Sequence, residues 1–105
     1  MEKVICERFE ILRKNIYDFS EKTFGKGRSY REPLHHLKEE IDEVLESGEE
    51  SEYADCLLLL LDSYSKRYPK KNVSDLIKSS EDKLEILKER KWNKPDENGV
   101  FKHKK

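Results

Sequence analysis

The feature that most limits the fold of this chain is the helical spacing of its apolar residues. In the first segment, apolar side chains recur three and four positions apart, at Ile5, Phe9, Leu12, Ile16 and Phe19. That spacing places them along one side of an α-helix. We therefore predict a helix over about residues 2–22.

The same pattern predicts three more helices, and turn-forming residues separate them. Pro33 suits the first turn of a helix, and Gly48 suits the end of one. Ser51 and Ser74 are expected to act as N-caps of the helices that follow. These helices are expected over about residues 33–47, 51–67 and 74–91.

The link between the second and third helices is only the segment SGEES, so these two helices are expected to run antiparallel as neighbours. The predicted fold is therefore an all-α four-helix bundle. Residues 1–105 are expected to form a single domain, and residues 93–105 an extended or looped C-terminal tail.

The composition limits the size of the core and the kinds of partner. Charged residues make up 43% of the 105 residues, and hydrophobic residues only 34%. So small an apolar fraction predicts a thin core that self-association completes. The net charge is −1, from 22 basic and 23 acidic residues, and gives no general attraction to nucleic acid or to an anionic membrane.

The apolar runs and the cysteines bear on the cellular compartment. Leu57 to Leu61 is a long apolar run, but it is far shorter than the roughly 20 residues that span a bilayer. Cys6 and Cys56 form no CxxC pair, and no secretory signal is evident, so both are expected to be free thiols. We expect a soluble, cytoplasmic protein.

Acidic residues are concentrated where the two neighbouring helices are expected to face each other. Glu40 and Glu43 lie three positions apart, and Glu52 and Asp55 repeat that spacing on the next helix. Residues three apart share a side of a helix, so an antiparallel pair can bring the four carboxylates face to face. Hard divalent cations prefer such a cage of oxygen ligands. The alternative is that these acids form the solvated edge of the bundle.

Other kinds of chemistry find little support in this sequence. It has no glycine-rich phosphate loop, no zinc spacing of Cys and His, and no evident Ser/His/Asp set. Metal-assisted hydrolysis is the chemistry for which the acidic residues are suited.

Several segments, in order, make the chain resemble a known family. Glu39, Glu40 and Glu43 form an EExxE motif, and Glu52 and Asp55 form the ExxD motif that follows it. This pair of motifs resembles the MazG-like superfamily of all-α nucleoside triphosphate pyrophosphohydrolases. More specifically, the chain resembles the small dATP/dGTP pyrophosphohydrolase branch over most of its length. The segments that carry the resemblance are TFG (23–25), PLHHLKEE (33–40), EYADCLLLLLD (52–62), KLEILKERKW (83–92) and PDENGVFKH (95–103).

The resemblance implies a metal centre and a reaction. By it, Glu40, Glu43, Glu52 and Asp55 are ligands of Mg²⁺, with Mn²⁺ as a substitute. Glu39 stands beside them as an outer-shell group or as one that orients water, and Glu39, Glu40 and Glu43 are the implied catalytic residues. The implied reaction is attack of water between the α and β phosphates of a nucleoside triphosphate, which gives a nucleoside monophosphate and pyrophosphate. A homodimer or homotetramer is also implied.

The resemblance also implies residues that hold the substrate. Lys83, Arg90 and Lys91 match a basic stretch that binds the triphosphate, and Trp92 and His36 are further candidates. Each has a structural alternative. The basic residues suit a solvated helix C-terminus, the tryptophan can cap the bundle, and the histidine can make a structural hydrogen bond.

Two other interpretations of function stay open. One is a catalytically silent helical module that binds a nucleotide or a protein partner. The other keeps the hydrolase but changes the substrate to dUTP or phosphoribosyl-ATP, which related all-α hydrolases use.

Overall fold

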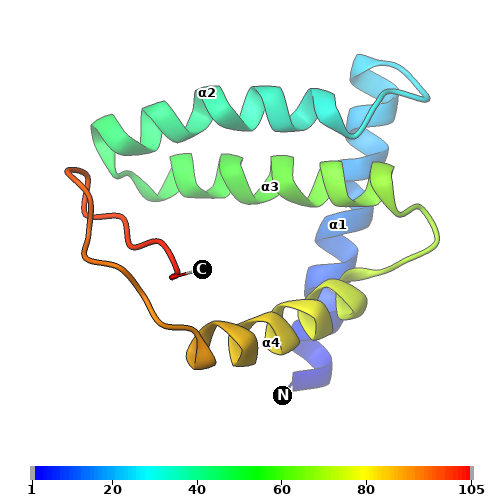
Figure 1. Cartoon of the computed structure of the whole chain (residues 1–105). Coiled ribbons are helices and arrows are strands. Elements are labelled where there is room, and N and C mark those ends of the chain that lie inside the picture. The colour runs from blue at the N-terminus through cyan, green and yellow to red at the C-terminus, as the bar shows by residue number, and fades with distance from the viewer. Residues whose placement is uncertain (1, 105) are drawn as a thin grey trace. The chain divides into compact units, whose positions relative to one another are not determined.

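The computed structural model of the chain describes residues 2–104 and contains four helices (Figure 1). They are α1 (Glu2–Phe24), α2 (Arg31–Ser47), α3 (Glu50–Arg67) and α4 (Val73–Glu89). The described residues form no strand, so the predicted all-α class is confirmed, and each observed helix end lies within two residues of the predicted one. Within this described part, no helix has the length and apolar character that crossing a membrane requires. Met1 and Lys105, the ends of the predicted domain, lie outside the described residues.

The chain forms two compact units, Met1–Ser74 and Asp75–Lys105. In the first unit, α3 packs against both α2 and α1. The helices α2 and α3 lie side by side and antiparallel (Figure 1), as the short link predicts. Gly48 ends α2 with a φ of 64°, and its N–H donates to the carbonyl oxygen of Val44 at 2.8 Å. Glycine adopts this left-handed conformation without steric cost, which explains why the helix ends there.

The predicted N-caps at Ser51 and Ser74 are wrong. Glu49 takes the cap position of α3 with an extended backbone and no side-chain cap hydrogen bond, so Ser51 lies inside the helix. Ser74 lies inside α4, which begins at Val73. The N–H of Val73 donates instead to the carboxylate of Glu10 in α1, at 2.9 Å. That contact joins distant parts of the sequence, so no local capping pattern indicates it.

The interior of the first unit is small and polar. Among the described residues, the buried apolar ones are Pro33 and, each 1% exposed, Leu61 and Val73. Where α1 crosses α3 (Figure 1), Ser20 Oγ donates to Asp62 Oδ2 at 2.7 Å. Hydrogen bonds between buried side chains therefore hold α1 against α3 where apolar burial is scarce. The buried polar residues are Ser20, Asp62, Ser63 and Ser65.

In the second unit, the residues after α4 fold back on themselves. Two backbone hydrogen bonds pair the arms, from Asn93 to Lys102 at 2.8 Å and from Lys104 to Lys91 at 2.7 Å. The carboxylate of Asp96 closes the turn by accepting two backbone N–H groups, each at 2.9 Å. An aspartate that bonds to its own following backbone is a common turn former. The tail is thus a short paired hairpin, although its sequence carries no apolar period.

Candidate active site

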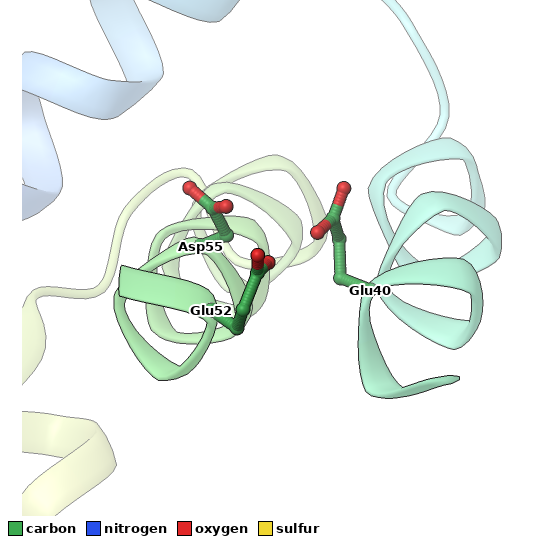
Figure 2. Close-up of side chains that lie close together, drawn as sticks. All are labelled: Glu40, Glu52 and Asp55. Atoms are coloured by element: carbon green, nitrogen blue, oxygen red, sulfur yellow. The ribbon is translucent and has the colours of Figure 1, made fainter. Parts of the chain in front are cut away.

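The antiparallel α2 and α3 bring carboxylates together on their facing sides. Glu40 extends from α2 toward α3, where Glu52 and Asp55 project from the neighbouring helix (Figure 2). One oxygen from each of these three carboxylates lies within 4.8 Å of the others. The structure therefore brings together three of the four residues expected to bind a metal.

The fourth expected ligand, Glu43, adjoins the same group. The pKa of Glu40 is raised by its hydrogen-bonding contact with Glu43, then by burial, and then by the negative charges of Glu43 and Asp55. The pKa of Glu52 is raised in the same order, by contact with Glu43, by burial and by the charges of the other acids. Two carboxyl groups bond to each other only when one of them holds a proton. Glu43 thus lies within reach of acids on both helices.

Glu40 has an incomplete set of hydrogen bonds. Its Oε1 lies 3.1 Å from Nε2 of His36, whereas its Oε2 is buried and, when Glu43 is also ionised, has no hydrogen-bond partner. A buried oxygen without a partner costs free energy, and the repulsion between crowded carboxylates adds to that cost. A divalent cation relieves both, and Mg²⁺ and Mn²⁺ prefer oxygen ligands of this kind. The donor atoms therefore fit the expected metal.

Cys56 lies beside the acids on α3 but is not activated by them. Its pKa is raised first by burial and then by the negative charges of the four surrounding acids. A raised pKa keeps the thiol protonated, and a protonated thiol is a poor nucleophile. The chemistry at this position consequently depends on the carboxylates.

Glu39 does not join the carboxylate group within one chain. It is exposed, and together with His35 and Asp42 it lines a groove on another side of α2. Consecutive residues of a helix point about 100° apart, which separates Glu39 from Glu40. The role of Glu39 in orienting water stays a prediction.

The basic residues expected to bind the triphosphate belong to the second unit. Lys83 lies in α4 and is exposed, whereas Arg90 and Lys91 directly follow that helix. Trp92 is 41% exposed, and its ring contacts that of His103 with the centroids 6.3 Å apart. Their roles in binding substrate stay predictions.

A buried polar cluster beside the acids is not evident from the sequence motifs. Lys66 Nζ donates to Asp62 Oδ1 at 2.6 Å and to Ser20 Oγ at 3.0 Å. These three residues line a cavity of about 210 Å³ that His36 also borders. The four-residue spacing of Asp62 and Lys66 indicates an ion pair on one helix. That spacing does not indicate burial, which the exposed fractions of 6% for Asp62 and 3% for Lys66 show.

The helices and their facing acids define an all-α protein whose oxygen donors are suited to a divalent cation. Residues 12–105 match the family model of dATP/dGTP pyrophosphohydrolase, and the chain belongs to this family. The resemblance found in the sequence motifs is thereby confirmed. The protein is a pyrophosphohydrolase, a hydrolase acting on phosphoric anhydrides. No curated protein and no solved structure significantly matches the chain.

Proposed function

We propose that the protein is a Mg²⁺-dependent nucleoside triphosphate pyrophosphohydrolase that cleaves dATP or dGTP between the α and β phosphates. The products are the nucleoside monophosphate and pyrophosphate. The observation that carries the proposal is the convergence of Glu40, Glu52 and Asp55, with an unpartnered oxygen on Glu40. The family supports the class of substrate, and the oxygen donors suit a cation that accompanies triphosphates.

The proposal assigns the cation to the carboxylates of Glu40, Glu43, Glu52 and Asp55. A bound Mg²⁺ or Mn²⁺ makes water more acidic and offsets negative charge on phosphate oxygens. His36 positions Glu40 through the contact of 3.1 Å between its Nε2 and Oε1. The side chain of His36 is 53% exposed, so it is also available to the substrate.

Basic residues of the second unit would bind the phosphates that leave as pyrophosphate. Lys83, Arg90 and Lys91 supply positive charge, and the planar guanidinium of Arg90 suits two phosphate oxygens at once. Trp92 offers an exposed aromatic surface near these cations in the chain. Replacing Arg90 by lysine should raise KM more than it lowers kcat, because charge is kept but the paired contact is lost.

We assign the working form of the enzyme to a homodimer or homotetramer. An apolar groove of about 460 Å³ follows α1 and includes Ile5, Phe9, Leu12 and Leu57. Ile5 and Leu12 remain 50% and 38% exposed there, and apolar side chains gathered on one face are typical of contact sites. A second copy would also add to a core in which few described apolar residues are buried. Sedimentation of the active enzyme as a monomer would contradict this assignment.

Product analysis tests the reaction. The protein is incubated with dATP, dGTP, dUTP or phosphoribosyl-ATP and Mg²⁺, and the products are separated. We expect monophosphate and pyrophosphate from the purine deoxynucleotides. Glu52→Gln should lower kcat at least about 100-fold, because a metal centre contributes several kcal/mol of charge stabilisation. Glu46→Gln is the matched control, since Glu46 is an exposed acid on α2 outside the carboxylate group.

Two outcomes would contradict the proposal. Release of a nucleoside diphosphate and phosphate would place the cleavage at another bond. Tight nucleotide binding without any product, unaffected by Glu52→Gln, would favour the catalytically silent binding module instead.

A further inference from the structure

The cavity of about 210 Å³ lies in the first unit, among α1, the loop that follows it, the start of α2 and the second half of α3. Phe24, Pro33 and Leu59 give it apolar walls. Ser20 and Asp62 line it as well, although they are only 2% and 4% exposed. Apolar walls with a few fixed polar groups are typical of sites for small molecules.

The charges around this cavity balance one another. Lys66 pairs with Asp62 at 2.6 Å, and Arg28 pairs with Glu32 at 3.0 Å. A polyanion such as triphosphate is attracted by an excess of positive charge, which these pairs do not provide. A neutral, flat group with a hydrogen-bonding edge suits the cavity better, since it needs no excess charge and can pack against the apolar walls.

Asp62 retains capacity to accept further hydrogen bonds. Its Oδ1 accepts from Lys66, and its Oδ2 accepts from Ser20 at 2.7 Å. An ionised carboxylate offers about four acceptor positions, so each oxygen can accept again. The pairing edge of guanine carries two adjacent donors, the N1–H and the 2-amino group. Adenine carries an acceptor, its N1, beside its amino group.

We propose that this cavity binds the base of the nucleotide and that Asp62 selects guanine over adenine. Guanine directs two N–H groups toward the carboxylate, whereas adenine directs a lone pair toward a buried negative charge. His36 borders the cavity and lies 3.1 Å from Glu40, so the cavity adjoins the carboxylate group. The inference rests on the proposed function, because it assigns the base of the same substrate.

The test compares kcat/KM for dGTP and dATP with the full-length enzyme and Mg²⁺. The unaltered enzyme is expected to prefer dGTP. Asp62→Asn should lower the dGTP/dATP ratio about 10- to 100-fold, the range that one paired contact to a base gives, because the amide replaces an acceptor by a donor. Ser63→Ala is the control, since Ser63 is buried on the same helix but donates to Tyr30 O, away from the cavity.

A second variant separates specificity from folding. Asp62→Asn combined with Lys66→Met removes both charges of the buried pair, so neither member is left inside the protein without the other, and it should show the same fall in the ratio. Binding of the α,β-methylene analogues of dGTP and dATP, measured by calorimetry, reports the preference without turnover. The expected result is tighter binding of the guanine analogue by the unaltered enzyme and a loss of that difference in both Asp62 variants.

The two proposals fail in distinguishable ways. Hydrolysis of dGTP and dATP with equal kcat/KM, or a ratio that neither Asp62 variant alters, overturns the inference and leaves the proposed function intact. Preferential binding of the guanine analogue without hydrolysis of any triphosphate overturns the proposed function and supports the assignment of the base.

Discussion

The buried pair of Asp62 and Lys66 gives a quantitative test of what holds α1 against α3. The two side chains are 6% and 3% exposed, and Nζ lies 2.6 Å from Oδ1. Asp62→Asn leaves the ammonium group of Lys66 inside the protein without a neutralising partner at that distance. Removing one member of a buried ion pair costs about 3–5 kcal/mol.

The surroundings of Lys66 place the cost near the lower end of that range. Its Nζ keeps the contact with Ser20 Oγ at 3.0 Å and lies 3.8 Å from a second carboxylate, that of Glu21. We therefore expect Asp62→Asn to lower the free energy of unfolding by about 3 kcal/mol. In a domain of this size, that loss lowers Tm by about 12–24 °C.

Urea unfolding followed by far-ultraviolet circular dichroism measures these free energies. Lys66→Met should also be destabilising, because it leaves the Asp62 carboxylate buried. The double variant should lose less than the sum of the two single losses, since neither charge is then left alone. Strictly additive losses would refute the reasoning, because they would mean that the two charges do not interact.

An exposed pair with the same spacing is the control for this cycle. Lys78 and Asp82 lie 2.7 Å apart, but their side chains are 72% and 60% exposed. Water already solvates both charges, so Asp82→Asn should leave the free energy of unfolding almost unchanged. A large loss at this pair would show that burial is not what makes the Asp62 pair important.

Glu40→Gln should raise the Tm of the metal-free protein at neutral pH, because it removes one of the crowded charges, and it should reduce the Tm gain on adding Mg²⁺ in a thermal-shift assay. In the metal-free protein, Glu40 and Glu52 have raised pKa values, so they bind a proton more tightly in the folded than in the unfolded state. This stabilisation of the folded state is complete at pH values below the ordinary carboxyl pKa, and it is lost as pH rises through the raised pKa values. Urea midpoints over a pH series should therefore fall as pH rises through this window, and less steeply with Mg²⁺. Gly48→Ala should cost about 1 kcal/mol, because its φ of 64° disfavours alanine although nothing lies within 4 Å of the added methyl group. Gly48→Asn should cost less in the same urea measurement.

The sequence predicts the fold where local spacing determines it. Apolar periodicity and turn residues locate the helix ends to within two residues. The three-residue spacing of Glu40 and Glu43, repeated by Glu52 and Asp55, predicts the carboxylate group because a link as short as SGEES forces the two helices to pack as antiparallel neighbours. The helix ends and the carboxylate group are both predictable because they depend on residues close in sequence.

Contacts between distant segments do not follow from spacing. Ser20 meets Asp62 across 42 positions, and Glu10 accepts the N–H of Val73 across 63. A polar residue on a helix is usually solvated, so periodicity alone does not predict its burial. Glu39 shows that neighbours in a sequence motif can also be separated in space. The EExxE motif groups it with Glu40, whereas the helix directs the two residues to different sides.

The two halves of α3 hold acidic residues in opposite electrostatic conditions. In the first half, acids crowd one another, and the pKa of Glu52 is raised. In the second half, Asp62 is neutralised by Lys66 at 2.6 Å. Asp55 and Asp62 are seven residues apart, which corresponds to about 10 Å along the helix axis. Unpaired acids attract an external cation, whereas a paired acid keeps only its capacity for hydrogen bonds. One helix can therefore present separate places to the two chemically different ends of a nucleotide, the charged phosphates with their cation and the neutral base.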